Sequence, residues 1–138
     1  LQAIGGWHML KRVDEINQLR RLNAARYDIG LRDVPGIVIP PRPIIFEQVF
    51  HTWVCCIEER RNEFIQFMAE KGCELKIHYP RCLHEQPGLK FLGYRRGDFP
   101  KAEWQADHQF SLPIHEYLTE EQIDYMVECI DAFCRRKT

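Results

Sequence analysis

With 138 residues, the chain has the length of one domain and can bury a substantial core. Its composition, with 45% hydrophobic and 28% charged residues, is that of an ordinary soluble globular protein. A net charge of -1 argues against nucleic acid or an anionic membrane surface as the main partner, and no apolar run approaches the roughly 20 residues that a membrane span needs.

The first predicted element is one long helix from Leu1 to about Tyr27. Apolar residues recur every three positions along it, with charged residues between them, and we expect these apolar residues to form a buried stripe. The stripe consists of Ile4, Trp7, Leu10, Val13, Ile16 and Leu19. Because the chain starts inside this pattern, without an initiator methionine or a capping residue, we expect it to be part of something longer.

Short strands and further helices follow a turn at Val34-Pro-Gly. The predicted strands are 37–39, 50–57 and 73–79. The predicted helices are 60–71, 99–110 and a last helix that Thr119 and Gln122 start with a capping box, while residues 111–115 are extended. We therefore predict a single α+β domain over residues 1–138, in which a short, mainly antiparallel sheet packs against helices in two layers. Residues 1–31 are its long linking helix and residues 32–138 its α/β sandwich.

The six cysteines fit buried, reduced thiols better than a disulfide framework. Two of them are adjacent, and several fall on apolar positions. They are Cys55, Cys56, Cys73, Cys82, Cys129 and Cys134. This usage predicts a cytoplasmic protein.

The most irregular stretch is residues 76–100, which prolines and glycines interrupt repeatedly. A long irregular segment inside a small domain is usually functional. Its imidazole, phenol and guanidinium groups suit an anionic or hydroxyl-rich ligand at a cleft wall, although a half-buried histidine and solvated arginines are the alternative interpretation. These groups belong to His78, Tyr79, Arg81, His84, Tyr94, Arg95 and Arg96.

Other chemistries find less support. None of the motifs G-x-G-x-x-G, G-x-x-x-x-G-K-[ST] and G-x-S-x-G occurs in the sequence. A zinc site from Cys73, His78, Cys82 and His84 matches no standard ligand spacing. Cys82 and His84 could form a nucleophile pair, but their proximity in a loop does not fix their geometry.

Four motifs follow one another through the second half of the chain. They are His78-Tyr-Pro-Arg-Cys-Leu-His84, Leu92-Gly-Tyr-Arg-Arg-Gly-Asp-Phe-Pro100-Lys-Ala-Glu103, Leu112-Pro-Ile-His115 and Leu118-Thr-Glu-Glu-Gln-Ile123. With Leu10-Lys-Arg-Val-Asp-Glu-Ile16 and Asn23-Ala-Ala-Arg-Tyr27 before them, they resemble the C-terminal small domain of the DegT-type sugar aminotransferases. That family consists of fold-type I enzymes that depend on pyridoxal phosphate (PLP).

The resemblance implies an enzyme that moves an amino group onto a keto sugar linked to a nucleotide, using PLP held by a lysine and paired with an aspartate. In that family, these groups precede the part that corresponds to Leu1, so the resemblance assigns no catalytic or cofactor-binding residue here. The lysines that match no family position are Lys11, Lys71, Lys76, Lys90, Lys101 and Lys137. The resemblance does assign substrate binding to His78, Tyr79 and His84, by hydrogen bonds to sugar or phosphate oxygens.

Three hypotheses follow from this resemblance. The first is that the chain is the substrate-cleft part of a nucleotide-sugar aminotransferase and is not catalytic alone. The second is a free-standing, non-catalytic binding or assembly module derived from that domain. The third is that a separate chain supplies the catalytic half. In each case, we expect exposed apolar surface on the first helix and self-association into a homo-oligomer.

Overall fold

The computed structural model describes residues 2–43 and 45–136, so that Leu1 and Lys137 lie outside the described residues. The helices are α1 (Gln2–Leu10), α2 (Val13–Leu31), α3 (Arg61–Glu70), α4 (Pro100–His108) and α5 (Glu120–Cys134). The strands are β1 (Ile37–Val38), β2 (Trp53–Ile57) and β3 (Gln109–Leu112). Two short 3-10 helices, η1 (Leu83–Glu85) and η2 (Pro87–Leu92), lie between α3 and α4.

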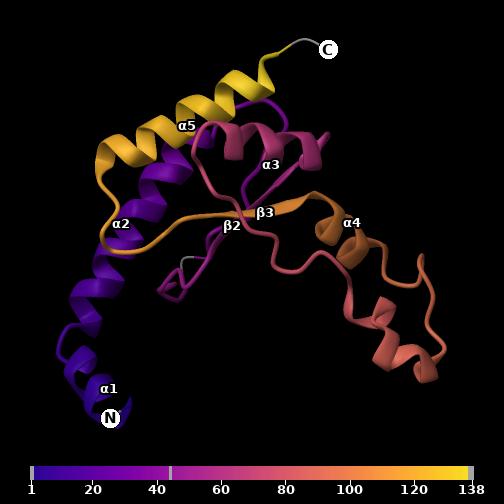
Figure 1. Cartoon of the computed structure of the whole chain (residues 1–138), viewed down its shortest axis with the longest axis horizontal. Coiled ribbons are helices and arrows are strands. Elements are labelled where there is room, and N and C mark those ends of the chain that lie inside the picture. The colour runs from indigo at the N-terminus through magenta and orange to yellow at the C-terminus, as the bar shows by residue number, and fades with distance from the viewer. Residues whose placement is uncertain (1, 44, 137–138) are drawn as a thin grey trace.

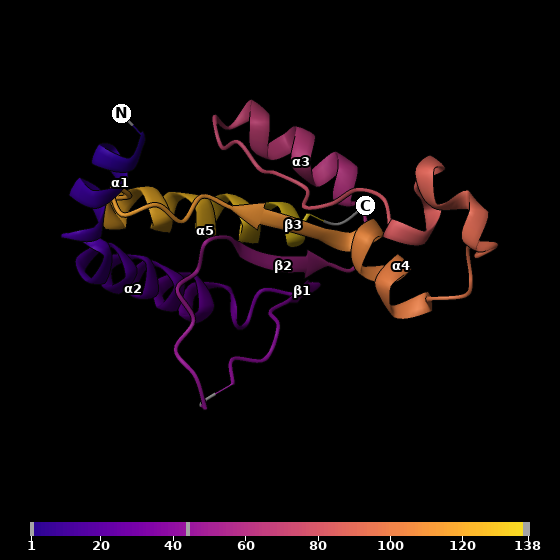
Figure 2. The same ribbon diagram turned by 90° about the horizontal axis from the view of Figure 1, so that it is seen from below.

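The three strands form one antiparallel sheet in the order β1-β2-β3. Helices α2, α3 and α5 gather along this sheet, as Figure 1 shows, and the view from below in Figure 2 separates α3 from α2 on either side of α5. The structure thus confirms the predicted α+β fold with a small antiparallel sheet packed against helices. Among the described residues, no helix combines the length and the apolar character that crossing a membrane requires.

Aromatic side chains hold the two layers together. The ring of Tyr27 on α2 lies 5.2 Å from that of Trp53 on β2, and both side chains are fully buried. Phe64 on α3 lies 4.8 Å from Phe110 on β3 and 5.2 Å from Phe133 on α5, measured between ring centroids. Burying such large rings is the main source of stability in a domain of this size.

Two predicted helices are confirmed. Helix α3 matches the prediction over 60–71 within one residue at each end. Helix α5 starts with the predicted capping box, in which Gln122 N donates to Thr119 Oγ1 at 3.3 Å and Thr119 N donates to Gln122 Oε1 at 3.0 Å. The predicted thiols also lie in the core, because all the cysteines are free and only Cys134 is partly accessible.

The prediction of one long helix with a buried stripe from Ile4 to Leu19 is wrong. The chain turns between α1 and α2, and Trp7 and Leu10 are 62% and 65% exposed. A strict spacing of three drifts around a helix of 3.6 residues per turn, so those residues do not share one face. The stripe that is buried comes later, at spacings of three and four, and consists of Ala24, Tyr27 and Leu31.

The predicted third strand over 73–79 is also wrong. Only Lys76 pairs there, in an isolated bridge with Ser111. On one side, the next hydrogen-bonded pair would place Glu74 opposite Pro113, which has no N–H to donate. The third strand is β3 instead, which the prediction divided between a helix over 99–110 and the extended residues 111–115. Strand β2 is shorter than predicted, because Phe50, with φ of 47°, leaves the extended region.

Candidate functional site

We call residues 78–99 the site segment. It leaves the core after the bridge at Lys76, passes through η1 and η2, and returns to the sheet through α4. Pro87 occupies the first position of η2, and Gly93, with φ of 78°, ends it. Figure 1 shows the segment extending from the sheet together with α4, so its two ends meet beside the core while its middle lies away from it.

A cleft of about 430 Å³ lies between the site segment and α4. One wall comes from the start of the segment and the other from α4 and the first residue of β3. The residues that line it are His78, Tyr79, Arg81, Cys82, Leu83, His84, Phe99, Ala102, Gln105, Ala106 and Gln109. The cleft therefore brings together the three residues that the sequence assigned to substrate binding.

His84 is the most firmly held of these residues. Its Nε2 lies 3.1 Å from Glu103 Oε1, and both side chains are 8% exposed. The imidazole also packs against the ring of Phe99, with 4.8 Å between the centroids. The backbone N–H of Gly97 donates to the same carboxylate at 2.8 and 2.9 Å, and that of Phe99 at 3.2 Å. This carboxylate thus holds both the histidine and the end of the site segment against α4.

The electrostatics of Glu103 follow from these contacts. Burial raises the pKa of a carboxyl group, because it disfavours the charged form. Here the N–H donors of Gly97 and Phe99, with His84, outweigh burial and lower the pKa of Glu103 below its ordinary value. The carboxylate is therefore ionised at neutral pH.

His78 and Tyr79 lie at the open side of the cleft. His78 Nδ1 is 3.0 Å from Ser111 Oγ, and the carbonyl of Tyr79 accepts a hydrogen bond from Gln109 Nε2 at 3.1 Å. The Tyr79 side chain itself is 74% exposed. His78 also lines an adjoining pocket of about 240 Å³, which His51 and His115 share. The two bonds to β3 fix the backbone and leave the phenol ring accessible.

The remaining predicted residues divide into two groups. Arg81 lines the cleft, whereas Tyr94, Arg95 and Arg96 do not. Arg96 instead forms ion pairs with Glu85 at 3.2 Å and with Asp107. Neither arginine of the pair at residues 95–96 therefore contributes to the lining of the cleft.

The nucleophile hypothesis for Cys82 and His84 does not fit this geometry. His84 directs Nε2 to Glu103, and the thiol of Cys82 is buried. Burial, followed by the nearby carboxylates of Glu85 and Glu103, raises the pKa of Cys82. A reactive cysteine needs the opposite shift, towards the thiolate.

Sequence reasoning missed Glu103, Gln105 and Gln109 as residues of this site. A signal was present for Glu103, because an acidic residue in the first turn after Pro100 favours a role at the helix N-terminus. The glutamines carried no such signal, because a polar residue on an amphipathic helix or an edge strand usually faces solvent.

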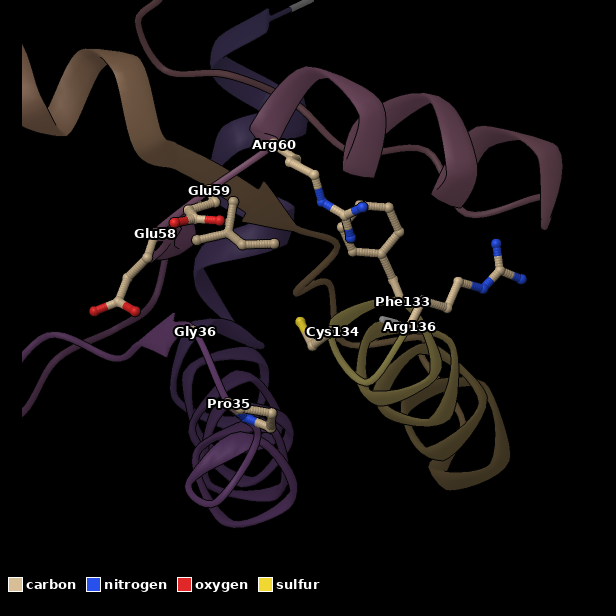
Figure 3. A pocket seen from close by; sticks show the side chains of 9 residues that line it. Pro35, Gly36, Glu58, Glu59, Arg60, Phe133, Cys134 and Arg136 are labelled. Atoms are coloured by element: carbon tan, nitrogen blue, oxygen red, sulfur yellow. The ribbon is translucent and has the colours of Figure 1, made fainter. Parts of the chain in front are cut away.

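A second cavity, of about 240 Å³, lies where β1 begins and where β2 and α5 end. Figure 3 shows the guanidinium of Arg60 over the ring of Phe133, while the carboxylate of Glu58 points away from both. The distance from the guanidinium carbon to the ring centroid is 4.7 Å. None of the histidines lines this cavity, so the cleft beside the site segment is the stronger candidate.

Comparisons with known proteins cover most of the chain. The model of the DegT/DnrJ/EryC1/StrS aminotransferase family matches residues 1–131. A "Pleiotropic regulatory protein" of Geobacillus stearothermophilus is 36% identical, over 89% of this chain and 33% of its own length. The "dTDP-3-amino-3,4,6-trideoxy-alpha-D-glucose transaminase" of Streptomyces venezuelae is 29% identical, over 92% of this chain and 33% of its own length.

The fold is also similar to that of solved structures. The crystal structure of S. venezuelae DesV in complex with a ketimine intermediate superposes with a TM-score of 0.88 and 29% sequence identity. The superposition covers 94% of this chain and 34% of that one. The chain therefore spans about a third of the length of the relatives that it matches.

Proposed function

Because this chain belongs to the DegT/DnrJ/EryC1/StrS aminotransferase family, we propose that it is the substrate-cleft part of a PLP-dependent aminotransferase acting on nucleotide-linked keto sugars. In this proposal, residues 1–31 link it to a larger domain and residues 32–138 form the small domain. The name of the S. venezuelae relative, a transaminase of a dTDP-linked amino sugar, supports the substrate class.

One observation carries the proposal for this chain: His78, Tyr79 and His84 line a single cleft of about 430 Å³. Each offers a polar group of a kind that pairs with sugar hydroxyl and phosphate oxygens. We assign them to substrate binding. Arg81 in the same lining adds a positive charge suited to a phosphate.

The described residues do not fit PLP itself. The cofactor needs a lysine facing the cleft and an acidic partner for its ring nitrogen. Lys11 and Lys71 lie over the rings of Trp7 and Phe67, and Lys76 pairs with Glu74. Among the described residues, no lysine lines the cleft. We therefore propose that this chain alone is not catalytic and that PLP binds elsewhere in a full-length family member.

A non-catalytic binding or assembly module remains the second candidate function. The observation that favours it is α1, in which none of the described residues is buried. A helix with Trp7 and Leu10 on its surface suits contact with another apolar surface, including a second copy of the chain. Both candidate functions predict self-association through α1.

The substrate proposal is tested by titrating the nitrogen-15-labelled chain with dTDP-glucose and following its amide resonances. We expect the largest shifts in residues 78–84 and at the start of α4. The variant His84→Ala should weaken binding, whereas His108→Ala should not, because His108 stacks on Trp104 and does not line the cleft. Shifts confined to other surfaces, or none, would count against the proposed site.

The non-catalytic proposal has its own test. The chain is mixed with an equimolar amount of PLP, reduced with borohydride and analysed by mass spectrometry. We expect no lysine to carry the cofactor in stoichiometric amounts. Stoichiometric labelling of one lysine would overturn this part of the proposal and leave the substrate assignment intact.

A further inference from the structure

Glu103 is a buried carboxylate to which the proposed function gives no role. It is 7% exposed, and its contacts with Gly97, Phe99 and His84 all come from N–H groups or a ring nitrogen. A carboxylate that carries its full charge accepts hydrogen bonds and donates none. The backbone contacts favour this state, because the N–H groups of Gly97 and Phe99 donate to the carboxylate oxygens.

The consequence for His84 is a fixed position of its hydrogen. Because the carboxylate can only accept, Nε2 of His84 must carry the hydrogen. The ring packs against Phe99, and turning it over would place Cε1 in the position of Nε2 and lose the bond to Glu103. Among the described residues, Nδ1 of His84 has no hydrogen-bond partner, which leaves it for a ligand in the cleft.

We propose that Glu103 is a positioning residue, which holds His84 in the Nε2–H tautomer so that Nδ1 accepts a hydrogen bond from a hydroxyl group of the ligand. The identity of that ligand rests on the proposed function. A sugar hydroxyl can donate to Nδ1 of the neutral ring, whereas a ketone or phosphate oxygen can only accept. Glu103 thereby sets which part of a nucleotide sugar His84 contacts, namely the hydroxyl groups of its hexose.

His78 provides an internal contrast. Its Nδ1 faces Ser111 Oγ at 3.0 Å, and a serine hydroxyl both donates and accepts. The partner of His78 therefore does not fix the tautomer, whereas the partner of His84 does. Two histidines of one cleft should differ in this property, which nitrogen-15 spectra measure directly.

The first experiment records these spectra on the isolated chain at about pH 8, where a typical imidazole is neutral. We expect the hydrogen of His84 on Nε2. In Glu103→Ala, no acceptor is left for Nε2, so the hydrogen of His84 should be shared between its two ring nitrogens. Glu85→Gln is the matched control, because it removes the carboxylate that pairs with Arg96 and should leave His84 unchanged.

The outcomes are distinct. An Nδ1–H tautomer in the unmodified chain overturns the proposal whether or not any variant folds. The same holds if Glu103→Ala keeps the amide spectrum of α5, which shows that it is folded, and also keeps the hydrogen entirely on Nε2.

The second experiment measures Kd for dTDP-glucose and for dTDP, which lacks the hexose hydroxyl groups. Glu103→Ala should weaken the binding of dTDP-glucose roughly ten-fold, the loss of about one hydrogen bond, and should leave the binding of dTDP unchanged. An equal loss for both ligands would indicate a merely structural role and would overturn the inference. If the unmodified chain binds neither ligand, the proposed function fails, while the tautomer spectra still decide the role of Glu103.

Discussion

Helix α1 and the site segment both extend away from the core, but they are held in different ways. Figure 1 shows α1 at one end of the molecule and the site segment at the other. Helix α1 has regular backbone hydrogen bonds and no buried residue. The site segment is mostly irregular, yet it contains the buried Cys82 and donates two backbone N–H groups to Glu103.

The difference teaches that regular secondary structure and attachment to the fold are separate properties. A helix of nine residues is marginal on its own, because its stability comes from packing. An irregular segment needs external partners for its backbone groups, and a buried carboxylate supplies them. We therefore expect the site segment to be the more protected of the two regions. The following changes test that expectation.

The largest effect should come from the core that supports both regions. Phe110 is fully buried and lies against Phe64, directly after α4. We expect Phe110→Ala to lower the free energy of unfolding by about 3–5 kcal/mol, as measured by urea denaturation. Phe91→Ala is the control, because Phe91 is 80% exposed in the site segment and its loss should stay within about 0.5 kcal/mol. Similar losses in both variants would contradict this division between core and segment.

The next effect is specific to the site segment and depends on pH. The pKa of Glu103 is lower in the folded chain than its ordinary value of 4.5. The ionised carboxylate therefore stabilises the folded segment above pH 4.5. This stabilisation is lost as the pH falls through the lowered pKa of the folded chain. We expect hydrogen-exchange protection of the Gly97 and Phe99 amides to fall roughly ten-fold or more over that acid range, before α5 loses protection.

Glu103→Gln sharpens this test, because it removes the titrating group. In that variant, an uncharged amide oxygen accepts from the Gly97 and Phe99 N–H groups, so these amides should be less protected at neutral pH than in the unmodified chain. They should also show little further change with acid. Glu85→Gln should behave like the unmodified chain. Protection that falls equally in the segment and in α5 would mean that Glu103 contributes to global stability and does not hold the segment locally.

A smaller effect compares two helices. Thr119→Ala removes the capping box of α5 and should lower the free energy of unfolding by about 1 kcal/mol, because α5 is part of the core. His8→Ala in α1 should change it by less than about 0.5 kcal/mol. Thermal denaturation of both variants measures the contrast. An equal loss would mean that α1 contributes to the folded core despite its exposure.

Much of the fold could be predicted from the sequence, for reasons that the elements make clear. Helix α5 combines a capping box with apolar residues at helical spacing, so local and packing signals agree. Strand β3 could not be predicted, because Gln109 and Phe110 also continue the helical pattern of α4. Its pairing with β2, in which Phe110 lies opposite Cys55, makes that segment a strand, and this partner lies far away in the sequence.

The candidate site could be predicted in part. His78 and His84 were named as candidates because prolines and glycines mark the segment as irregular, and both line the cleft. Their partners were not found, since Ser111 and Glu103 reach them through the bridge at Lys76 and through α4. A histidine's hydrogen-bond partner depends on tertiary structure, so the sequence alone cannot distinguish the fixed His84 from the adaptable His78.

The smallest effect on stability should come from α1, and it tests whether α1 is the region that lacks a partner within the fold. Trp7 is 62% exposed, so Trp7→Asp should leave the free energy of unfolding within about 0.5 kcal/mol of the original. Because it removes apolar surface and adds charge, it should shift the chain towards the monomer in light scattering at high concentration. Leu83→Asp is the matched control, since Leu83 is 78% exposed in the site segment. If only the Leu83 variant becomes more monomeric, the self-associating surface lies on the site segment and α1 is not the region that needs a partner.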